Sequence, residues 1–177
     1  MDNRYILTAF GKDKPGVVAD VSRIIYEIGG NLEDSTMTRL VDEFAIILLF
    51  SVHGPEIEEL LTMECRRLER DKAISAFFRQ LETVSIQTPP SQPSHTLLIE
   101  GIDHTGIVYR VSRFLADRGI NIVNLSSEVI PSPESGSALY HMEIKVSAPE
   151  TCRLDEMSLG LERLGEELHV EIEVQSK

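Results

Sequence analysis

The stretch GKDKPGVVADVSR, residues 11–23, returns ninety residues later as GIDHTGIVYRVSR, residues 101–113. The match continues past this stretch to a later glycine and asparagine. The identical pairs are Gly11/Gly101, Asp13/Asp103, Gly16/Gly106, Val18/Val108, Val21/Val111, Ser22/Ser112, Arg23/Arg113, Gly29/Gly119 and Asn31/Asn121. A repeat with one constant offset indicates two copies of a single structural unit.

The residues around each copy predict the same order of elements. A short β-prone stretch comes first, and a helix with one apolar face follows the Asp-x-x-Gly turn. A hairpin, a second helix near a proline and a closing strand complete the pattern. The expected strands are 5–10, 32–40, 44–52 and 83–87 in the first half and 96–100, 122–130, 138–146 and 169–175 in the second, with helices beginning near Pro55 and Pro149. The order predicts an α+β protein made of two tandem ferredoxin-like βαββαβ domains, each an antiparallel sheet with helices on one face.

Length and composition fit two small domains. The 177 residues are 42% hydrophobic and 26% charged, an ordinary globular composition. A proline-rich stretch predicts a linker at residues 89–95, between domains at residues 1–88 and 96–177. The first half holds one irregularity, because Ile74, Phe77, Phe78 and Leu81 recur at helical spacing. We therefore expect a longer or additional helix there.

The charge of the chain argues against direct binding of DNA or RNA. The net charge is −12, with ten Lys/Arg against fifteen Asp/Glu in residues 1–88 and seven against fourteen in residues 89–177. Nucleic-acid binding depends on cations that replace the counterions of the phosphates, and no Lys/Arg-rich block is present. Arg66, Arg67 and Arg70 lie among glutamates, which indicates a solvated helix face.

Cysteine use and hydropathy favour the cytoplasm. Cys65 and Cys152 stand alone in stretches expected to be helical, which predicts reduced thiols and neither a disulfide framework nor a metal site. The N-terminus lacks the basic and apolar segments of a secretory signal, and the longest apolar run, residues 44–50, is too short to span a bilayer. We therefore expect a soluble, cytoplasmic protein without a membrane segment.

The repeated turn is the first candidate for a functional site. Asp13 and Asp103 are expected to accept hydrogen bonds from backbone N–H groups of the following helix, and Gly16 and Gly106 to permit a close backbone approach. Free N–H groups at a helix start, with the positive end of the helix dipole, favour a small anion such as a carboxylate. A purely structural role, in which these residues only shape a tight connection, stays open.

Asn31 and Asn121 follow the glycine-bearing end of each first helix, and their amides offer donors and an acceptor to a zwitterionic ligand. Each copy contains Gly-x-Asp-x-x-Gly, an amphipathic helix, Gly-x-Asn-Ile/Leu and a hairpin, in this order. This pattern, present twice, resembles the ACT domain, a regulatory module that senses amino acids. Within that superfamily, residues 12–40 and the following EFAIILLFSV look like the two-domain family of the glycine cleavage system transcriptional repressor. The segment NLEDS, residues 31–35, is the most telling part.

The resemblance implies a ligand-regulated protein that is not an enzyme. In ACT domains the effector typically lies where two domains meet, between the first-strand turn of one and the asparagine region of its neighbour. Two substitutions distinguish the copies, because His104 and Thr105 replace Lys14 and Pro15 and leave the second turn less pre-organised. The implied ligand-binding residues are Asp13, Lys14, Pro15, Gly16 and Asn31 in the first copy and Asp103, His104, Gly106 and Asn121 in the second.

The resemblance also implies partners. It implies a small amino acid such as glycine or serine, a homodimer, and a regulatory protein partner, which in the repressor family is a DNA-binding transcription activator. No cofactor or metal is expected, since the five histidines show no ligand spacing and no nucleophile elbow or phosphate loop is present. Two alternatives stay open: an ACT regulatory subunit that controls a metabolic enzyme, and a ligand-independent dimerisation module that pairs through strand edges.

Overall fold

The computed structural model describes residues 3–81, 94–131, 138–149 and 152–176. The chain divides into two compact units, Met1–Ser85 and Ile86–Lys177, which are described separately here. Most of the predicted linker, residues 89–95, lies outside the described residues, and its last residue, His95, begins a strand of the second unit.

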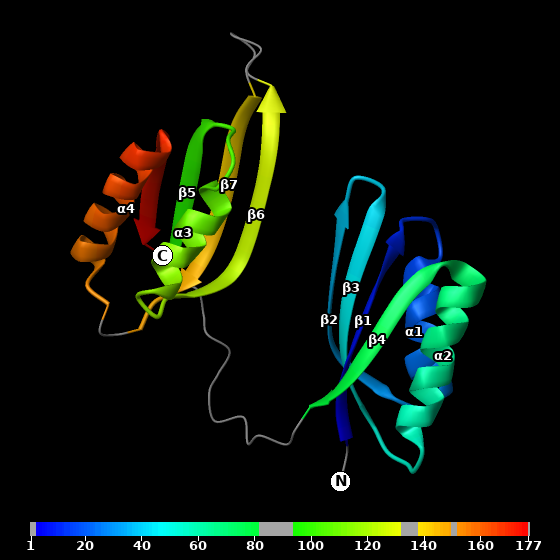
Figure 1. The fold of residues 1–177 in the computed structure, drawn as a ribbon. Helices are drawn as coiled ribbons and strands as arrows, with labels where there is room; N and C mark the ends of the chain where they lie inside the picture. Colours follow the sequence, from blue (N-terminus) through cyan, green and yellow to red (C-terminus); the bar gives the residue numbers. More distant parts are fainter. Residues whose placement is uncertain (1–2, 82–93, 132–137, 150–151, 177) are drawn as a thin grey trace. The chain divides into compact units, whose positions relative to one another are not determined.

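The first unit is an antiparallel four-stranded sheet in the order β2-β3-β1-β4. Both helices cover the same face of this sheet (Figure 1). Its elements are β1 (Asn3–Lys12), α1 (Val17–Glu27), β2 (Asn31–Leu40), β3 (Glu43–Val52), α2 (Ile57–Lys72) and β4 (Ile74–Leu81).

The second unit repeats this plan with the strand order β6-β7-β5-β8. Its elements are β5 (His95–Ile102), α3 (Ile107–Ala116), β6 (Asn121–Pro131), β7 (Ala138–Ser147), α4 (Leu154–Leu168) and β8 (Val170–Ser176). The predicted α+β class, with two tandem βαββαβ units, is confirmed.

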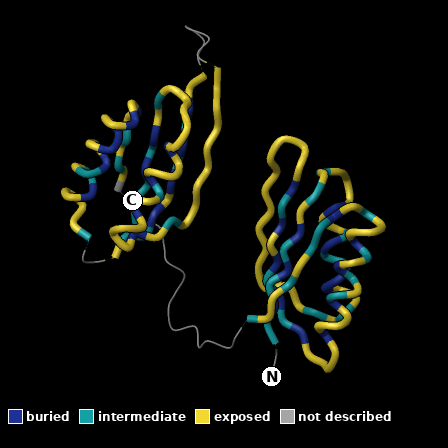
Figure 2. The backbone as a smooth tube through the Cα atoms, in the orientation of Figure 1, coloured by how far each residue is buried: buried dark blue, intermediate teal, exposed yellow. Residues whose placement is uncertain are grey.

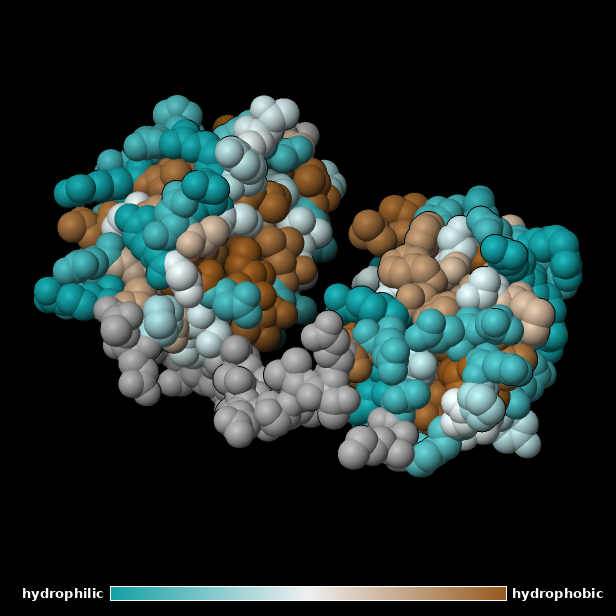
Figure 3. Space-filling view, turned by 60° about the horizontal axis from the view of Figure 1, so that its bottom comes forward, coloured by the Kyte–Doolittle hydropathy of each residue, from teal (hydrophilic) through white to brown (hydrophobic). Residues whose placement is uncertain are grey.

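The core of each unit lies between the sheet and its two helices. Successive residues of a strand point to opposite faces, and Tyr5, Leu7 and Ala9 of β1 alternate with less buried neighbours. Helix α1 buries the stripe Val17, Val21, Ile24 and Ile25, as its spacing predicts. The other face of the first sheet remains partly open, so Phe10, Ile47 and Phe77 are between 44% and 57% exposed. Hydrophobic surface gathers in patches on both units in the view of Figure 3.

The helix predicted from Ile74, Phe77, Phe78 and Leu81 is wrong, because these residues form β4. Ile74 and Phe78 face the helices, whereas Phe77 lies on the open face of the sheet. Because the open face of this sheet is partly apolar, β4 has apolar residues on both of its faces. Together these residues give the three- and four-residue spacing that is typical of a helix. The fourth strand of the first sheet is therefore β4, and the strand predicted at residues 83–87 falls outside the described residues.

The prolines and one cysteine also differ from expectation. Helix α2 begins two residues after Pro55 and α4 begins five residues after Pro149, so neither proline lies in a first helical turn. Cys65 lies in α2 as expected, whereas Cys152 precedes α4. The glycines that end α1 and α3 were predicted correctly: Gly29 and Gly119 have φ of 71° and 67°, a left-handed conformation that favours glycine.

The strands β2 and β6 are exposed along nearly their whole length (Figure 2). Each lies at one edge of its sheet, so one side of the strand has no partner among the described residues. Such an edge can pair with another chain.

Candidate functional site

The repeated turn has the same backbone geometry in both units. Gly16 and Gly106 are the N-caps of α1 and α3, with φ of 98° and 99°. A Cβ built on either glycine would meet no atom within 4 Å. The glycines are therefore required by their positive φ, and the predicted close backbone approach is absent.

The predicted capping role of Asp13 and Asp103 is wrong. Among the residues that the structure describes, no side chain makes a capping hydrogen bond at the start of α1 or α3. The carboxylate of Asp13 lies instead 3.3 Å from Nε of Arg39 on β2. The backbone N–H of Asp13 donates to the carbonyl of Asp42, and that of Asp103 donates to Ala138. Within the described residues, the first-turn N–H groups of both helices thus have no side-chain partner, although the N–H of Val17 donates to the carbonyl of Lys14 at 3.3 Å. Such a helix start suits an anion.

Lys14 and His104 connect the turn to the second helix of their unit. Nζ of Lys14 donates to the carbonyl of Lys72, the last residue of α2, at 3.3 Å. In the second unit, Nε2 of His104 lies 2.5 Å from the carbonyl of Leu168, the last residue of α4. A cationic side chain at a helix C-terminus also complements the negative end of the helix dipole. Both residues were predicted to bind a ligand, and the structure gives each a contact within its own unit.

Protonation of His104 strengthens this contact. Its Nδ1 lies 3.1 Å from the carbonyl of Thr105, so each ring nitrogen faces a carbonyl oxygen. Only the doubly protonated ring can donate to both oxygens. The carbonyl of Leu168, followed by that of Thr105, raises the pKa of His104 above its ordinary value, and the neighbouring carboxylate of Asp103 acts in the same direction.

We expect the stability of the second unit to depend on pH through His104. Because its folded-state pKa is raised, its contribution is fully present below the unfolded-state pKa of about 6.5 and is lost as pH rises through the folded-state value. The test compares unfolding free energies of the wild type, His104→Gln and His104→Lys across this range. His104→Lys should hold its advantage over His104→Gln at higher pH, as its charge persists. A pH-independent difference between wild type and His104→Gln would contradict the assignment.

Asn31 and Asn121 lie far from the turn of their own unit. Asn31 is opposite Ser51 in the β2–β3 register, whereas Lys12, beside the turn, is opposite Glu43. The eight residues from Glu43 to Ser51 correspond to roughly 26 Å along a strand. The second unit has the same separation, because Asn121 pairs with Ser147 and Ile102 pairs with Leu139. The turn and the asparagine of one unit therefore cannot contact the same small ligand.

A shallow pocket of about 710 Å³ lies at the first turn. It includes all four predicted turn residues, the first residues of α1 and one residue of β2. The lining residues are Asp13, Lys14, Pro15, Gly16, Val17, Val18, Ala19, Ser22 and Met37. Met37 and Arg39 were not predicted as site residues. The register of β2 against β3, which a single sequence does not fix, places them on the helix side of the strand.

The remaining reactive side chains of the described residues do not form a metal site. No group of three His, Cys, Asp or Glu side chains there could hold a metal ion. Burial raises the pKa of the Cys65 thiol to about 11, so this side chain remains a thiol near neutral pH. No described helix has the length and apolar character needed to cross a membrane.

Comparisons with known proteins agree with this architecture. Residues 3–77 match the ACT domain family. The glycine cleavage system transcriptional repressors of Escherichia coli (strain K12) and Shigella flexneri are each 25% identical to this chain over 167 residues, 94% of this chain and 86% of theirs. Because these relatives span most of the chain, they support a regulatory role.

Two solved structures share the complete fold. An unknown protein from Galdieria sulphuraria is 29% identical, with a TM-score of 0.78 over 100% of this chain and 99% of the other. A protein proposed to be a glycine cleavage system transcriptional repressor has a TM-score of 0.71 over 99% of this chain and 97% of its own. It is 22% identical to this chain and therefore supports the fold alone. Residues 3–77 therefore match the ACT domain family, the second unit repeats the same fold, and the chain as a whole is similar to the glycine cleavage system transcriptional repressors.

Proposed function

We propose that this chain is a non-enzymatic regulator of transcription that senses a small amino acid and acts through a partner protein rather than by binding DNA. The observation that carries the proposal is the duplicated turn, in which a left-handed glycine begins a helix whose first N–H groups lack a side-chain cap. Such a helix start attracts the carboxylate of an amino acid. The acidic composition of both halves disfavours direct contact with nucleic-acid phosphates.

Each amino-acid site is proposed to combine the turn of one ACT unit with the asparagine of another. The separation of roughly 26 Å within a unit supports this division, because a single small ligand cannot bridge it. The turn would bind the carboxylate, and the amide of Asn31 or Asn121 would bind the polar groups beside it. A homodimer is one arrangement that supplies the second unit.

The expected affinity suits a sensor. Glycine has few non-hydrogen atoms, and the ceiling of about −1.5 kcal/mol per atom limits binding to roughly −7 to −10 kcal/mol for glycine or serine. Real affinities are then micromolar to millimolar, near metabolite concentrations. A coupling of about 1–3 kcal/mol between effector and partner is sufficient for regulation.

Thermal denaturation of the full chain with each of the twenty amino acids tests the sensing role. An amino acid present at about one hundred times its Kd should stabilise the folded protein by about 2.7 kcal/mol. For a unit of this size that corresponds to a rise in Tm of roughly 10–20 °C. Asn31→Ala and Asn121→Ala should reduce this response, whereas Asn124→Ala, an exposed change on β6, should not. A chain that responds to none of the twenty is better explained as a dimerisation module.

The partner requires a separate measurement. Affinity purification of the tagged chain, with and without the stabilising amino acid, should recover a DNA-binding protein whose recovery changes with the effector. Recovery of a metabolic enzyme instead would favour the role of an enzyme's regulatory subunit. A shift of bare DNA by the purified chain would contradict the proposed indirect mechanism.

A further inference from the structure

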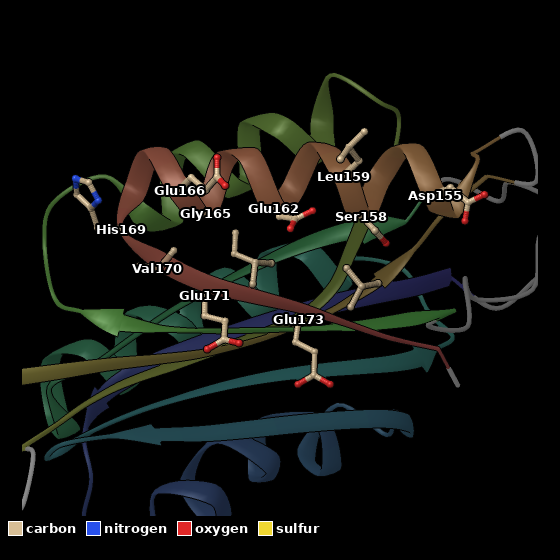
Figure 4. Close-up of a pocket in the computed structure, with 12 residues that line it drawn as sticks. Asp155, Ser158, Leu159, Glu162, Gly165, Glu166, His169, Val170, Glu171 and Glu173 are labelled. Atoms are coloured by element: carbon tan, nitrogen blue, oxygen red, sulfur yellow. The ribbon is translucent and has the colours of Figure 1, made fainter.

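An open groove of about 1020 Å³ runs between α4 and β8 of the second unit. Figure 4 shows α4 along one side and β8 along the other, with Glu162 and Glu166 on the helix. The side chains of Glu171 and Glu173 leave β8 on the side away from α4 (Figure 4). Leu159, Ile172 and Val174 give the groove an apolar lining, and Leu159 is 51% exposed.

The strand that borders the groove is an edge strand. β8 pairs with β5 on one side and has no partner strand on the other among the described residues. The backbone N–H and C=O groups of such an edge can bind an extended segment, which then continues the sheet. An added strand would place alternate side chains in the groove, beside Ile172 and Val174, and the others on the open face of the sheet.

The charge around the groove and its strand indicates that a basic segment would fit there. The side chains of Asp155, Glu162 and Glu166 line it from α4, Glu171 and Glu173 of β8 carry their carboxylates to the open face of the sheet, and no Lys or Arg is among the lining residues. The ion pairs of α4 within the described residues are those of Glu156 with Arg153 and of Glu167 with Arg110, both outside the lining. Within the described residues, no ion pair joins Asp155, Glu162 or Glu166 to a cation.

The equivalent surface of the first unit has the opposite character. Ala73 and His169 are the left-handed C-caps of α2 and α4. When these two residues are aligned, each residue near the groove corresponds to the residue 96 positions earlier in the first unit. At this offset Arg66 and Arg70 correspond to Glu162 and Glu166, and Phe78 corresponds to Val174. The ring of Phe78 packs on Tyr5, with ring centroids 6.2 Å apart. The acidic groove is thus a property of the second unit and not of the fold.

A second β8 strand is a poor occupant of this edge. Pairing two copies would bring the exposed Glu171 and Glu173 of one strand beside the same carboxylates of the other, which is destabilising. A segment that alternates apolar and basic residues matches both sides of β8. Its apolar side chains would contact Ile172 and Val174, and its basic side chains would face Glu171 and Glu173.

We propose that the groove between α4 and β8 binds an extended segment of a partner protein with alternating apolar and basic residues, which adds to β8 as a fifth strand. This proposal does not depend on whether the chain binds an amino acid. The probe is a fluorescein-labelled eight-residue peptide of alternating lysine and valine, capped at both ends. Fluorescence anisotropy measures its affinity for the full chain, and amide NMR shifts locate the bound peptide.

The peptide should shift amides of β8 and α4. Glu171→Arg combined with Glu173→Arg reverses the charges that the lysines of the peptide would face and should weaken binding at least tenfold. Val174→Phe, which adds the bulk found at Phe78, should weaken it without a change of charge. Glu59→Arg combined with Glu128→Arg makes the same change in net charge at exposed positions outside the groove. This control should bind within threefold of the wild type.

Two N-methylated peptides test strand addition without any change to the protein. One peptide carries methyl groups on its lysine amides, and the other carries them on its valine amides. Because the N–H groups of alternate residues point to opposite edges of a strand, each peptide has the hydrogen bonds of a different edge blocked, and the two have the same charge. One of the two should lose at least tenfold in affinity and the other should bind nearly as well as the parent. The proposal is overturned if both bind alike, if the two double variants bind alike, or if the shifted amides lie outside β8 and α4.

Discussion

Replacing Phe50 with alanine is expected to lower the free energy of unfolding of the first unit by about 3–5 kcal/mol. Phe50 is fully buried, and its ring stacks on Tyr5 with centroids 5.7 Å apart. It also packs on Gly30, where a Cβ would lie 3.3 Å from the ring. The surrounding strands and α1 cannot close the cavity without losing these contacts. Urea denaturation measures the loss, and hydrogen exchange in β1 and β3 assigns it to the first unit.

Ile47→Ala is the matched control on the same strand. Ile47 lies on the opposite face of β3 and is 44% exposed. Its replacement should cost about 1 kcal/mol or less, since little buried contact is removed. Equal losses for Phe50→Ala and Ile47→Ala would contradict the assignment of the two faces of this sheet.

Much of the fold is predictable because local patterns and the repeat agree. Alternating apolar residues identified β8, and the apolar stripe of α1 identified the helix. Gly29 and Gly119 marked the ends of the first helices because a left-handed residue without a Cβ is favoured there. Each of these signals depends on neighbouring residues, which a single sequence contains.

The misassigned strand shows where local pattern is insufficient. Phe77 and Phe78 are adjacent apolar residues, and only the partly apolar open face of the first sheet explains why both belong to a strand. The repeat itself held the missing signal. With the offset of 96 residues, β4 aligns with the alternating stretch of β8, which was predicted correctly.

The sequence was sufficient to predict which residues form the repeated turn, but not which residues they contact. The sequence identified Asp13, Lys14 and His104 as the turn residues. It did not identify Arg39 as the partner of Asp13, or the ends of α2 and α4 as the partners of Lys14 and His104. These contacts join residues that lie far apart in the sequence, and they depend on strand register and helix length. The groove between α4 and β8 escaped prediction for the same reason.

Gly101→Val is expected to destabilise the second unit by about 3 kcal/mol or more, at the upper end of the cost of overpacking. A Cβ on Gly101 would lie 2.7 Å from Cγ1 of Val170 and 3.0 Å from both the carbonyl oxygen of His169 and Cα of Val170. Two of these three atoms belong to the backbone, so β8 must move away from β5. Urea denaturation followed by circular dichroism measures the loss.

Gly11→Val is the comparison, because Gly11 holds the same place in the first unit with more room. A Cβ there would lie 3.0 Å from the carbonyl oxygen of Ala73, but 3.5 Å from Cα of Ile74. It should therefore cost its unit less than Gly101→Val costs the second. Val170 begins β8, so Gly101→Val should also weaken the lysine–valine peptide, whereas Gly11→Val should leave its affinity unchanged. Equal unfolding midpoints for Gly101→Val and the wild type would show that β8 does not cross Gly101 this closely.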